Sequence, residues 1–518
     1  MDNSKRRGPA LDRRELMKGA AAVGGALMVP GLAQAQTPRK GGTLRVAMPF
    51  NPASVDPMTG RNLPDFNVLY AVHDTLIDFE PKTLELKPGL AKSWSFTDPK
   101  TLVLELVDGV KFHDGAPFNA EAVKINLERY KSDQRSNVKA DMATVDAVEV
   151  NSPTKVTIRL NRPNSGLPTM LTNRIGCMVS PTLIKEKGPN LDRVAVGTGP
   201  FKFVSWQDND NFKLVRNENY WRSGQPHLDG IEFRIINELN TLTRTVVAGE
   251  ADVGLNLQVP QKLIADRSKN VIAVASPSLV FFGAFLNYAR PPLDDVRVRQ
   301  AMNYAIDRDE INKVILSGLG QPSSGVLPKE HWACDPETQN YYTHDLAKAK
   351  KLLADAGHPN GIEIESWGWS DQLAMQRQEL IIAQLAKAGI RVKLQPVAPQ
   401  QAMQFFMLET KGSMLISPSG GFPDPSQYYE ALYGATALRN AGKIELPGFR
   451  ELLDATMAAQ DQPSRKAAFA KLQKFTIENA LQLVQYVNPG VTIRSPKVQN
   501  FVDGLLTTPK FNEVWLEA

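Results

Sequence analysis

The sequence from Leu90 to Tyr130 reads LAKSWSFTDPKTLVLELVDGVKFHDGAPFNAEAVKINLERY and holds a strand, a turn and a helix start in one block. Leucine alternates with Val103 and Glu105 over 102–106, which predicts a strand with one buried face. Asp108-Gly109 predicts a tight turn, because glycine accepts the positive φ that such a turn requires. Residues 110–112 are expected to pair back as a short strand. Nothing in the block calls for a catalytic role.

Helix and strand signals alternate along the rest of the chain. Asn119 is a favourable N-cap for a helix that begins at Ala120. Period-two alternation predicts strands over 44–48, 156–160, 231–235 and 390–394, and a 3.6-residue period predicts helices within 298–306, 346–356 and 380–388. The predicted fold class is therefore mixed α/β, with several lobes.

The first 35 residues carry an export pattern. Asp12–Lys18 reads DRRELMK, two arginines followed by an apolar pair and a lysine, as in twin-arginine signals. A Gly/Ala-rich apolar run over 19–32 leads to Ala33-Gln34-Ala35, a small-x-small cleavage site. A membrane helix needs about 20 strongly apolar residues, and this run is shorter and diluted with glycine. We therefore expect a leader over 1–35, cleaved after Ala35, and a soluble periplasmic protein with no lipid-anchoring cysteine at the cleavage point.

The charge of the chain excludes some partners. The 518 residues have a formal net charge of +5, with six basic and three acidic residues in the leader, so the remainder is nearly neutral. A nearly neutral protein has no global reason to bind nucleic acid or acidic lipid. Neither is expected as a partner.

Motifs of catalysis and cofactor binding are missing. The sequence has no G-x-S-x-G elbow, no H-E-x-x-H and no Walker loop. Gly197 and Gly199 form a lone pair followed by proline, and His331 and Cys334 have no further metal-ligand partners at a suitable spacing. No enzyme activity, metal or other cofactor is expected. The alternative is an exported hydrolase acting on peptides or esters, for which the sequence offers no convincing nucleophile.

The block at 90–130 resembles the signature segment of bacterial extracellular solute-binding proteins of the peptide/nickel type, solute-binding protein family five. Other blocks resemble the family in the expected order: Gly41–Val46, Gly197–Lys202, Ala248–Val253, Pro292–Ala301 and Ala356–Gly361. The resemblance covers nearly the whole chain after the leader. It implies a two-lobed periplasmic-binding-protein fold with an extra small domain. It also implies a monomer that captures a small solute, peptide-like or another organic molecule, and delivers it to the membrane permease subunits of an ABC-type importer.

The resemblance further implies a domain plan. Domain I would combine 36–78, 191–286 and 488–518, domain II would cover 79–190, and domain III would cover 287–487. Crossings near Leu286-Asn287 and Val487-Asn488 would form a hinge, with the ligand between domains I and III. Two cysteines are too few for a disulfide scaffold, and Cys177 and Cys334 would lie in different domains. Export permits a bridge, but two free or buried thiols are expected.

The candidate ligand-binding residues centre on the loop Ser417–Ser426, which is rich in glycine and proline. The resemblance implies that this loop lines the cleft; the alternative is an ordinary surface turn. Trp367 and Trp369, which lie on the same side if their segment is a strand, could form a stacking wall or pack in the core. His73 could reach the cleft, although a structural role is expected. The candidate residues are Gly420, Gly421, Phe422, Asp424, Trp367, Trp369, Tyr428 and Asn287.

One departure from the family pattern bears on the ligand. Peptide-binding members resemble this loop as W-x-x-D-x-x-D-P, and their first aspartate holds the peptide's α-ammonium. That aspartate falls on Gly421 here, and the tryptophan falls on Pro418. Asp424 matches the second aspartate and is expected to cap the following helix. Free-amine peptides are therefore expected to bind poorly, with room beside Gly421 for a bulkier group, unless another acid such as Asp424 or Asp65 has taken over the role.

Overall fold

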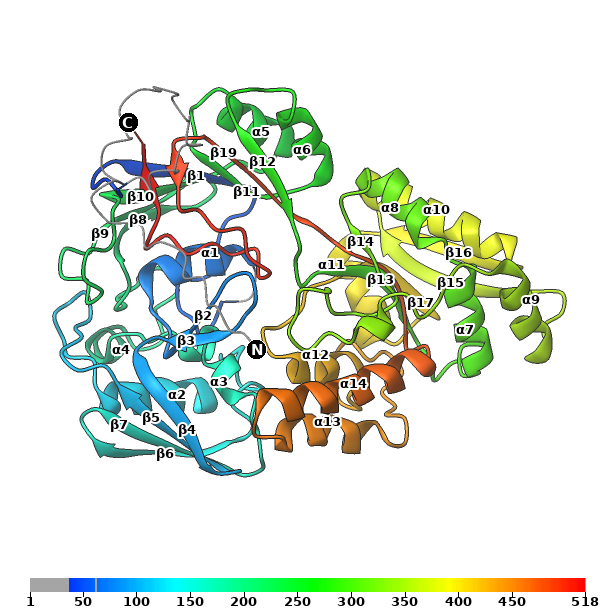
Figure 1. Cartoon of the computed structure of the whole chain (residues 1–518), viewed down its shortest axis with the longest axis horizontal. Helices are drawn as coiled ribbons and strands as arrows, with labels where there is room; N and C mark the ends of the chain where they lie inside the picture. Colours follow the sequence, from blue (N-terminus) through cyan, green and yellow to red (C-terminus); the bar gives the residue numbers. More distant parts are fainter. Residues whose placement is uncertain (1–36, 61–62, 518) are drawn as a thin grey trace, which may run out of the picture. The chain divides into compact units, whose positions relative to one another are not determined.

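A seven-stranded sheet gathers strands from distant parts of the sequence (Figure 1). The computed structural model describes residues 37–60 and 63–517. In spatial order the strands are β12 (Ile272–Ser276), β19 (Gly490–Arg494), β11 (Val253–Leu257), β1 (Thr43–Met48), β10 (Gly230–Ile235), β9 (Asn211–Arg216) and β8 (Phe201–Gln207). The predicted alternation in β1 is confirmed, because Leu44, Val46 and Met48 are fully buried. The helices α1 (Leu63–Val72), α5 (Leu239–Val247) and α6 (Val259–Ala265) accompany this sheet.

The block that decides the fold class supplies two strands of a four-stranded antiparallel sheet and the helix that packs against it. The order is β4 (Ala91–Asp98), β5 (Thr101–Leu106), β7 (Lys155–Leu160) and β6 (Val145–Ser152), and α2 (Ala120–Ser132) packs on this sheet. Asn119 caps α2 by accepting a hydrogen bond from Ala122 N at 3.0 Å. Short elements complete the region: β2 (Ile77–Phe79), β3 (Leu86–Pro88), α3 (Leu167–Met170), η1 (Arg174–Gly176) and α4 (Pro181–Lys187).

The short strand expected over residues 110–112 is absent from its expected place. Gly109 makes the predicted turn at a φ of +75°. β5 is already paired on both sides, by β4 and β7, so no edge is left for a returning strand. Lys111 instead forms a single bridge with Pro117.

A six-stranded sheet carries helices on both faces. Its order is β14 (Gln321–Pro322), β18 (Gln482–Val487), β13 (Phe281–Leu286), β17 (Met414–Ser419), β15 (Ile362–Trp369) and β16 (Ile390–Val397). Alternate residues of β13 enter two different cores: Phe282 and Leu286 face one, and Phe281 and Phe285 face the other. The first core includes residues of α7 (Val296–Ala305), α8 (Arg308–Leu316), α9 (Leu346–Asp355) and α10 (Gln372–Lys387). The second includes residues of α11 (Pro399–Met403), η3 (Gln404–Leu408), α12 (Pro425–Tyr433), α13 (Phe449–Ala458) and α14 (Gln462–Glu478).

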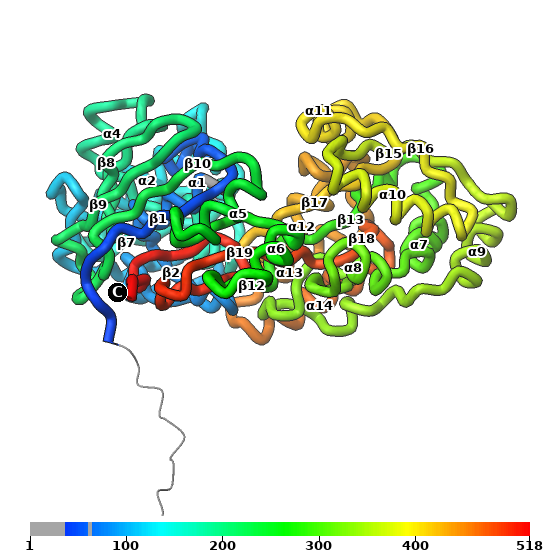
Figure 2. Tube along the Cα trace, turned by 90° about the horizontal axis from the view of Figure 1, so that it is seen from above, coloured from blue at the N-terminus to red at the C-terminus, as the bar shows by residue number. Residues whose placement is uncertain are grey.

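The chain crosses between the seven-stranded and six-stranded sheets twice (Figure 2). One crossing is residues 277–280, between β12 and β13, and the other is residues 488–489, between β18 and β19. The two lie side by side, because Asn488 N donates to Val280 O at 2.7 Å. The first crossing comes earlier than the expected Leu286-Asn287, because β13 is already a central strand of the six-stranded sheet.

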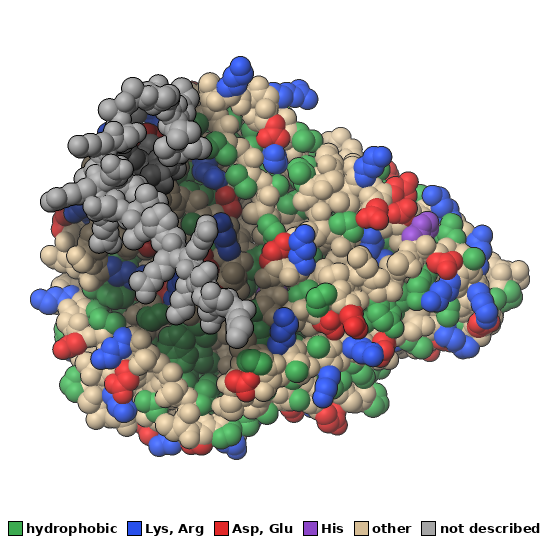
Figure 3. All heavy atoms as spheres, in the orientation of Figure 1, with side chains coloured by type: hydrophobic (Ala, Val, Ile, Leu, Met, Phe, Trp, Pro, Cys, Tyr) green, Lys and Arg blue, Asp and Glu red, His purple; other side chains and the backbone are tan. Residues whose placement is uncertain are grey.

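The remaining described elements are short: η2 (Pro336–Thr338), β20 (Val498–Gln499) and β21 (Trp515–Leu516). No helix in the described ranges is both long enough and apolar enough to span a membrane. Basic and acidic side chains are interspersed on the face shown in Figure 3.

Candidate functional site

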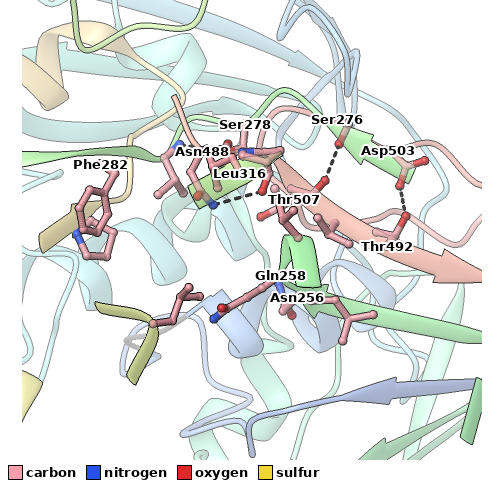
Figure 4. A pocket seen from close by; sticks show the side chains of 18 of the residues that line it. Asn256, Gln258, Ser276, Ser278, Phe282, Leu316, Asn488, Thr492, Asp503 and Thr507 are labelled. Atoms are coloured by element: carbon pink, nitrogen blue, oxygen red, sulfur yellow. Dashed lines mark hydrogen bonds between the residues drawn. The ribbon is translucent and has the colours of Figure 1, made fainter. Parts of the chain in front are cut away.

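A cavity of about 360 Å³ lies beside the two crossings (Figure 4). This volume falls within the range typical of small-molecule sites. Both sheets, both crossings and the carboxyl-terminal segment contribute to its walls, including Asn256, Gln258, Ser276, Ser278, Val280, Phe282, Trp369, Arg377, Ile416, Pro418, Asn488, Phe501, Asp503 and Thr507. A solute in this cavity would therefore touch both sheets at once. We refer to it as the cleft.

Hydrogen bonds within the protein hold the crossing wall of the cleft (Figure 4). Ser278 Oγ donates to Asn488 O at 2.6 Å, and Ser276 Oγ donates to Gly490 O at 3.4 Å. Asp503 accepts from Thr492 Oγ1 at 2.6 Å and pairs with the Arg494 guanidinium at 2.9 Å. These groups satisfy one another, and the one carboxylate of this wall is already matched by a cation.

Asn256 reaches the cleft through an irregularity in β11. Its φ is +55°, and the pairing of β11 with β19 shifts register between Gly254 and Leu257. A non-glycine residue at positive φ and a β-bulge both mark places where a side chain is redirected, often beside a binding site. Asn256 Oδ1 accepts from Asn67 Nδ2 at 3.0 Å, which fixes the orientation of the amide.

Aromatic rings form the opposite wall. Phe282 stacks on Tyr486 with ring centroids 5.4 Å apart and planes 8° from parallel. The guanidinium carbon of Arg377, on α10, lies 5.0 Å from the Phe282 ring centroid. Ile416 and Val280 add apolar surface. This wall suits an organic solute with an apolar portion.

The two tryptophans of β15 have different surroundings. They share one side of the strand, as predicted, but only Trp369 lines the cleft. Trp367 packs on Phe405, with centroids 4.7 Å apart, and its Nε1 donates to Lys411 O at 2.9 Å. Trp367 therefore belongs to the packing under η3.

The loop Ser417–Ser426, the glycine loop, does not form the cleft wall that was expected. Pro418 is among the described residues that line the cleft. Gly420, Gly421 and Phe422 are not among them. Arg439 covers the loop: its Nη1 donates to Gly420 O at 3.1 Å, and its guanidinium carbon lies 5.5 Å from the Phe422 ring centroid. Burial lowers the pKa of Arg439.

The space expected beside Gly421 is absent. A Cβ atom at Gly421 would lie 2.8 Å from Leu279 O and 2.9 Å from Leu279 Cβ, in the first crossing. Real Cβ atoms do not approach a backbone oxygen so closely, and packed interiors resist such additions. Gly421 therefore allows close packing of the loop on the crossing, and it does not open room for a ligand group.

Asp424, Tyr428 and Asn287 are structural in this arrangement. Asp424 caps α12 as predicted, accepting from Ser426 N at 3.0 Å, but it is fully buried and pairs with Arg465 at 2.9 Å. Tyr428 is buried and donates to Ser419 O at 3.2 Å, and burial raises its pKa. Asn287 Oδ1 accepts from Ala289 N at 3.3 Å. None of the three is among the described residues that line the cleft.

His73 and the cysteines have structural surroundings. His73 is buried with its Nδ1 3.0 Å from Met178 O, and burial lowers its pKa. Cys177 and Cys334 are both free and buried, as expected, and burial raises the pKa of Cys334 to about 11. Within the described ranges, no group of three or more His, Cys, Asp and Glu side chains is arranged to hold a metal ion.

The sequence profile of the bacterial extracellular solute-binding proteins, family 5 middle region, matches residues 85–440. The chain is 31% identical over 355 residues to the glutathione-binding protein GsiB of Escherichia coli strain K12, covering 67% of this chain and 68% of that protein. It is 32% identical over 345 residues to GsiB of Pectobacterium atrosepticum, covering 66% of each.

Solved structures share the fold. DppA of Helicobacter pylori in complex with the peptide STSA superposes with a TM-score of 0.80 at 25% identity, covering 93% of this chain and 99% of that chain. CtaP of Listeria monocytogenes gives a TM-score of 0.83 at 21% identity, covering 92% and 100%. AgaA of A. tumefaciens R10, in complex with agropinic acid, gives 0.79 at 24% identity, covering 92% and 99%. The last two likenesses bear on the fold alone.

Proposed function

Because the chain belongs to the bacterial extracellular solute-binding proteins of family 5, we propose that it binds one small organic solute in the cleft and closes around it. The two-lobed periplasmic-binding-protein fold predicted from the sequence is confirmed. The protein is the substrate-binding component of an ABC-type importer, and the exported-hydrolase alternative finds no support. The observation that carries the binding proposal is a cleft walled by both sheets and both crossings.

Hinge motion follows from the two crossings. Each is only a few residues long, so the sheets can rotate about them. The proposed domains are domain I, built on the seven-stranded sheet, domain II around 79–190, and domain III, built on the six-stranded sheet. A solute that contacts both sides of the cleft shifts the population towards the closed form by its differential affinity. A micromolar dissociation constant, about −8 kcal/mol, is the expected scale.

Three measurements test binding and closure together. Mass spectrometry identifies the solute that co-purifies from the native periplasm, and calorimetry with that solute should give one site without turnover. Small-angle scattering should then show a smaller radius of gyration with the solute than without it. Hydrolysis of the solute would contradict the binding role, and an unchanged radius of gyration at saturation would contradict closure.

Free-amine peptides are a poor match for the cleft, because its two lining carboxylates are engaged: Asp503 pairs with Arg494 at 2.9 Å, and Asp371 accepts from Ala374 N at 3.0 Å. A buried ammonium needs a paired anion, and the position that supplies it in peptide binders is Gly421 here. Asp424 is occupied by Arg465, and Asp65 is fully buried and accepts from Ala53 N at 2.6 Å. Calorimetry with di- and tripeptides and their N-acetylated counterparts tests this. Tight binding of free peptides that acetylation abolishes would overturn the proposal.

Export by the twin-arginine pathway and cleavage after Ala35 complete the proposal; Arg13, Arg14 and Ala35 lie outside the described residues. Replacing both arginines with lysine should leave precursor in the cytoplasm. The exported protein should begin at Gln36 and elute as a monomer in size-exclusion chromatography with light scattering. An unchanged periplasmic yield of the double variant would exclude this pathway.

A further inference from the structure

Gly166 forms a close contact between two regions whose buried cores are distinct. It comes directly before Leu167 of α3, which belongs to a core of buried residues within 58–178. A Cβ atom at Gly166 would lie 2.7 Å from Asp424 Oδ1, 2.8 Å from its Cγ and 2.9 Å from its Oδ2. Asp424 begins α12, which contributes to a core of buried residues within 281–484. The contact therefore joins the region of the four-stranded sheet to that of the six-stranded sheet.

The backbone does not require glycine at position 166. Gly166 has a φ of −80° and a ψ of −14°, in the right-handed helical region that any residue adopts. The three heavy atoms nearest to an added Cβ all belong to Asp424. The missing side chain therefore serves the contact with Asp424 and not a special turn.

The Asp424 carboxylate is held in place. Arg465 Nη2 donates to both of its oxygens, at 3.1 and 2.9 Å, and Ser426 N donates to Oδ1 at 3.0 Å. The Asp424 side chain is fully buried. A side chain at position 166 would therefore break these bonds or push the two regions apart, because overpacking a close contact is costly.

The region that carries Gly166 is fastened to the side of the seven-stranded sheet. Asp56, between β1 and α1, forms a buried ion pair with Arg129 of α2. Tyr70 of α1 donates from its hydroxyl to Thr172 O at 3.2 Å. On the other side, α12 follows β17 of the six-stranded sheet. Rotation of the two sheets about the crossings would therefore open the contact at position 166.

We propose that Gly166 determines the solute affinity without touching the solute, because its missing side chain lets the two regions meet at Asp424 when the protein closes. This rests on the proposed function. Gly166 is not among the described residues that line the cleft. A change that raises the free energy of the closed form alone lowers the closed fraction, and the apparent dissociation constant rises by the same factor. Gly166 is thus a positioning residue for binding.

Gly166→Ala tests the proposal with the smallest side chain. The probe is the small-molecule fraction of periplasm from the native host, used as a dilution series in equilibrium dialysis against solute-free protein. Mass spectrometry counts the compound that the wild type retains. The amount of extract needed for half-maximal retention should rise about 10- to 100-fold in the variant, because the overpacking falls on the closed form. Gly166→Leu should lose at least as much.

Two further readouts distinguish this role from a structural one. Solute-free Gly166→Ala should unfold at the wild-type temperature, because the two regions can part instead of being strained. Spin labels at Glu128→Cys and Lys474→Cys, two exposed positions on α2 and α14 (Figure 1), report the distance between the two sides. The native cysteines are buried, so the introduced ones take the labels. Extract should bring the labels to one short distance in the wild type, and the variant should not reach it.

Gly420→Ala is the matched control. It lies in the glycine loop, four residues before Asp424, and a Cβ there would meet nothing within 4 Å. It should therefore retain the compound as the wild type does and reach the same label distance.

The outcomes separate the role of Gly166 from the function of the protein. Wild-type affinity in both Gly166 variants, or a lower unfolding temperature of solute-free Gly166→Ala with unchanged label distances, would overturn the role of Gly166 and leave the importer function intact. Retention of nothing by the wild type, or chemical conversion of the retained compound, would overturn the proposed function itself.

Discussion

The ion pair of Asp424 and Arg465 is the most deeply buried charge interaction beside the glycine loop. Their side chains are 0% and 8% exposed, and the carboxylate also caps α12. Gly166, from the region of the four-stranded sheet, packs on the same carboxylate so closely that a Cβ there would lie 2.7 Å from Asp424 Oδ1. Asp424 thus joins the start of α12, α14 and the neighbouring region, which explains why it has no capacity for a ligand.

Asp424→Asn tests the ion pair independently of the helix cap. The amide oxygen can still accept from Ser426 N, whereas the negative charge that pairs with Arg465 is lost. The substitution leaves Arg465 buried without a counterion, and breaking a buried pair in this way costs about 3–5 kcal/mol of the free energy of unfolding. Urea denaturation should show this loss, while calorimetry on the folded variant should show unchanged solute affinity. Glu363→Gln removes an exposed pair with Lys393 and should leave the unfolding midpoint in place. If the Asp424→Asn variant lost solute binding and kept its stability, Asp424 would instead be a ligand-binding residue.

At the scale of the element, the loop between β17 and α12 contains two adjacent glycines with opposite surroundings. A Cβ at Gly420 would meet nothing within 4 Å, whereas one at Gly421 would meet Leu279 O at 2.8 Å. Gly421→Ala should therefore destabilise the protein by about 1–3 kcal/mol through overpacking, and Gly420→Ala should be neutral or slightly stabilising. Thermal unfolding of the two alanine variants gives the comparison directly. Equal effects at both positions would show that the loop does not pack on the first crossing.

Strands and caps could be predicted because their signals are local. The alternation in β1 and the Asn119 cap need only neighbouring residues, and both are found as predicted. The cleft depends on distant contacts. Trp367 and Trp369 share one face of β15. Which of the two lines the cleft depends on η3, which covers Trp367. Arg377 sits in a helix whose sequence pattern does not distinguish a cleft-facing arginine from a solvent-facing one, and Asn256 owes its position to a bulge.

At the scale of the whole described unit, the crossings are not the only link between the two sides. Ser165 N donates to Met457 O at 2.9 Å, and Gln427 Nε2 donates to Asp141 Oδ1 at 2.7 Å. These contacts join the region of the four-stranded sheet to α12 and α13. They are made in the arrangement described here, and opening about the crossings would separate them. Asp141 is therefore a titratable group at one of these contacts, and opening about the crossings would expose it to solvent.

Acidity should stabilise the folded protein at this position, because it removes the charge of the buried Asp141 carboxyl. Burial raises the pKa of Asp141 to about 6, against the lowering effects of Gln427 and Arg174. Since the folded carboxyl takes up its proton more readily than the unfolded one, the contribution of Asp141 to stability is greatest at low pH. That contribution is lost as the pH rises from about 4 to about 6. Above this window the buried charge costs about 2–3 kcal/mol relative to the protonated form.

Asp141→Asn should remove this pH dependence, because the amide stays neutral and its oxygen can still accept from Gln427. The variant should unfold at a higher temperature than the wild type at pH 7, and the difference should shrink towards pH 4. Comparing two proteins at each pH cancels the titration of all other groups. Asp146→Asn, at an exposed position nearby, serves as the control and should show no such trend. A wild type that equals or exceeds the Asp141→Asn variant in stability at pH 7 would mean that the carboxylate is favourably placed in its charged form.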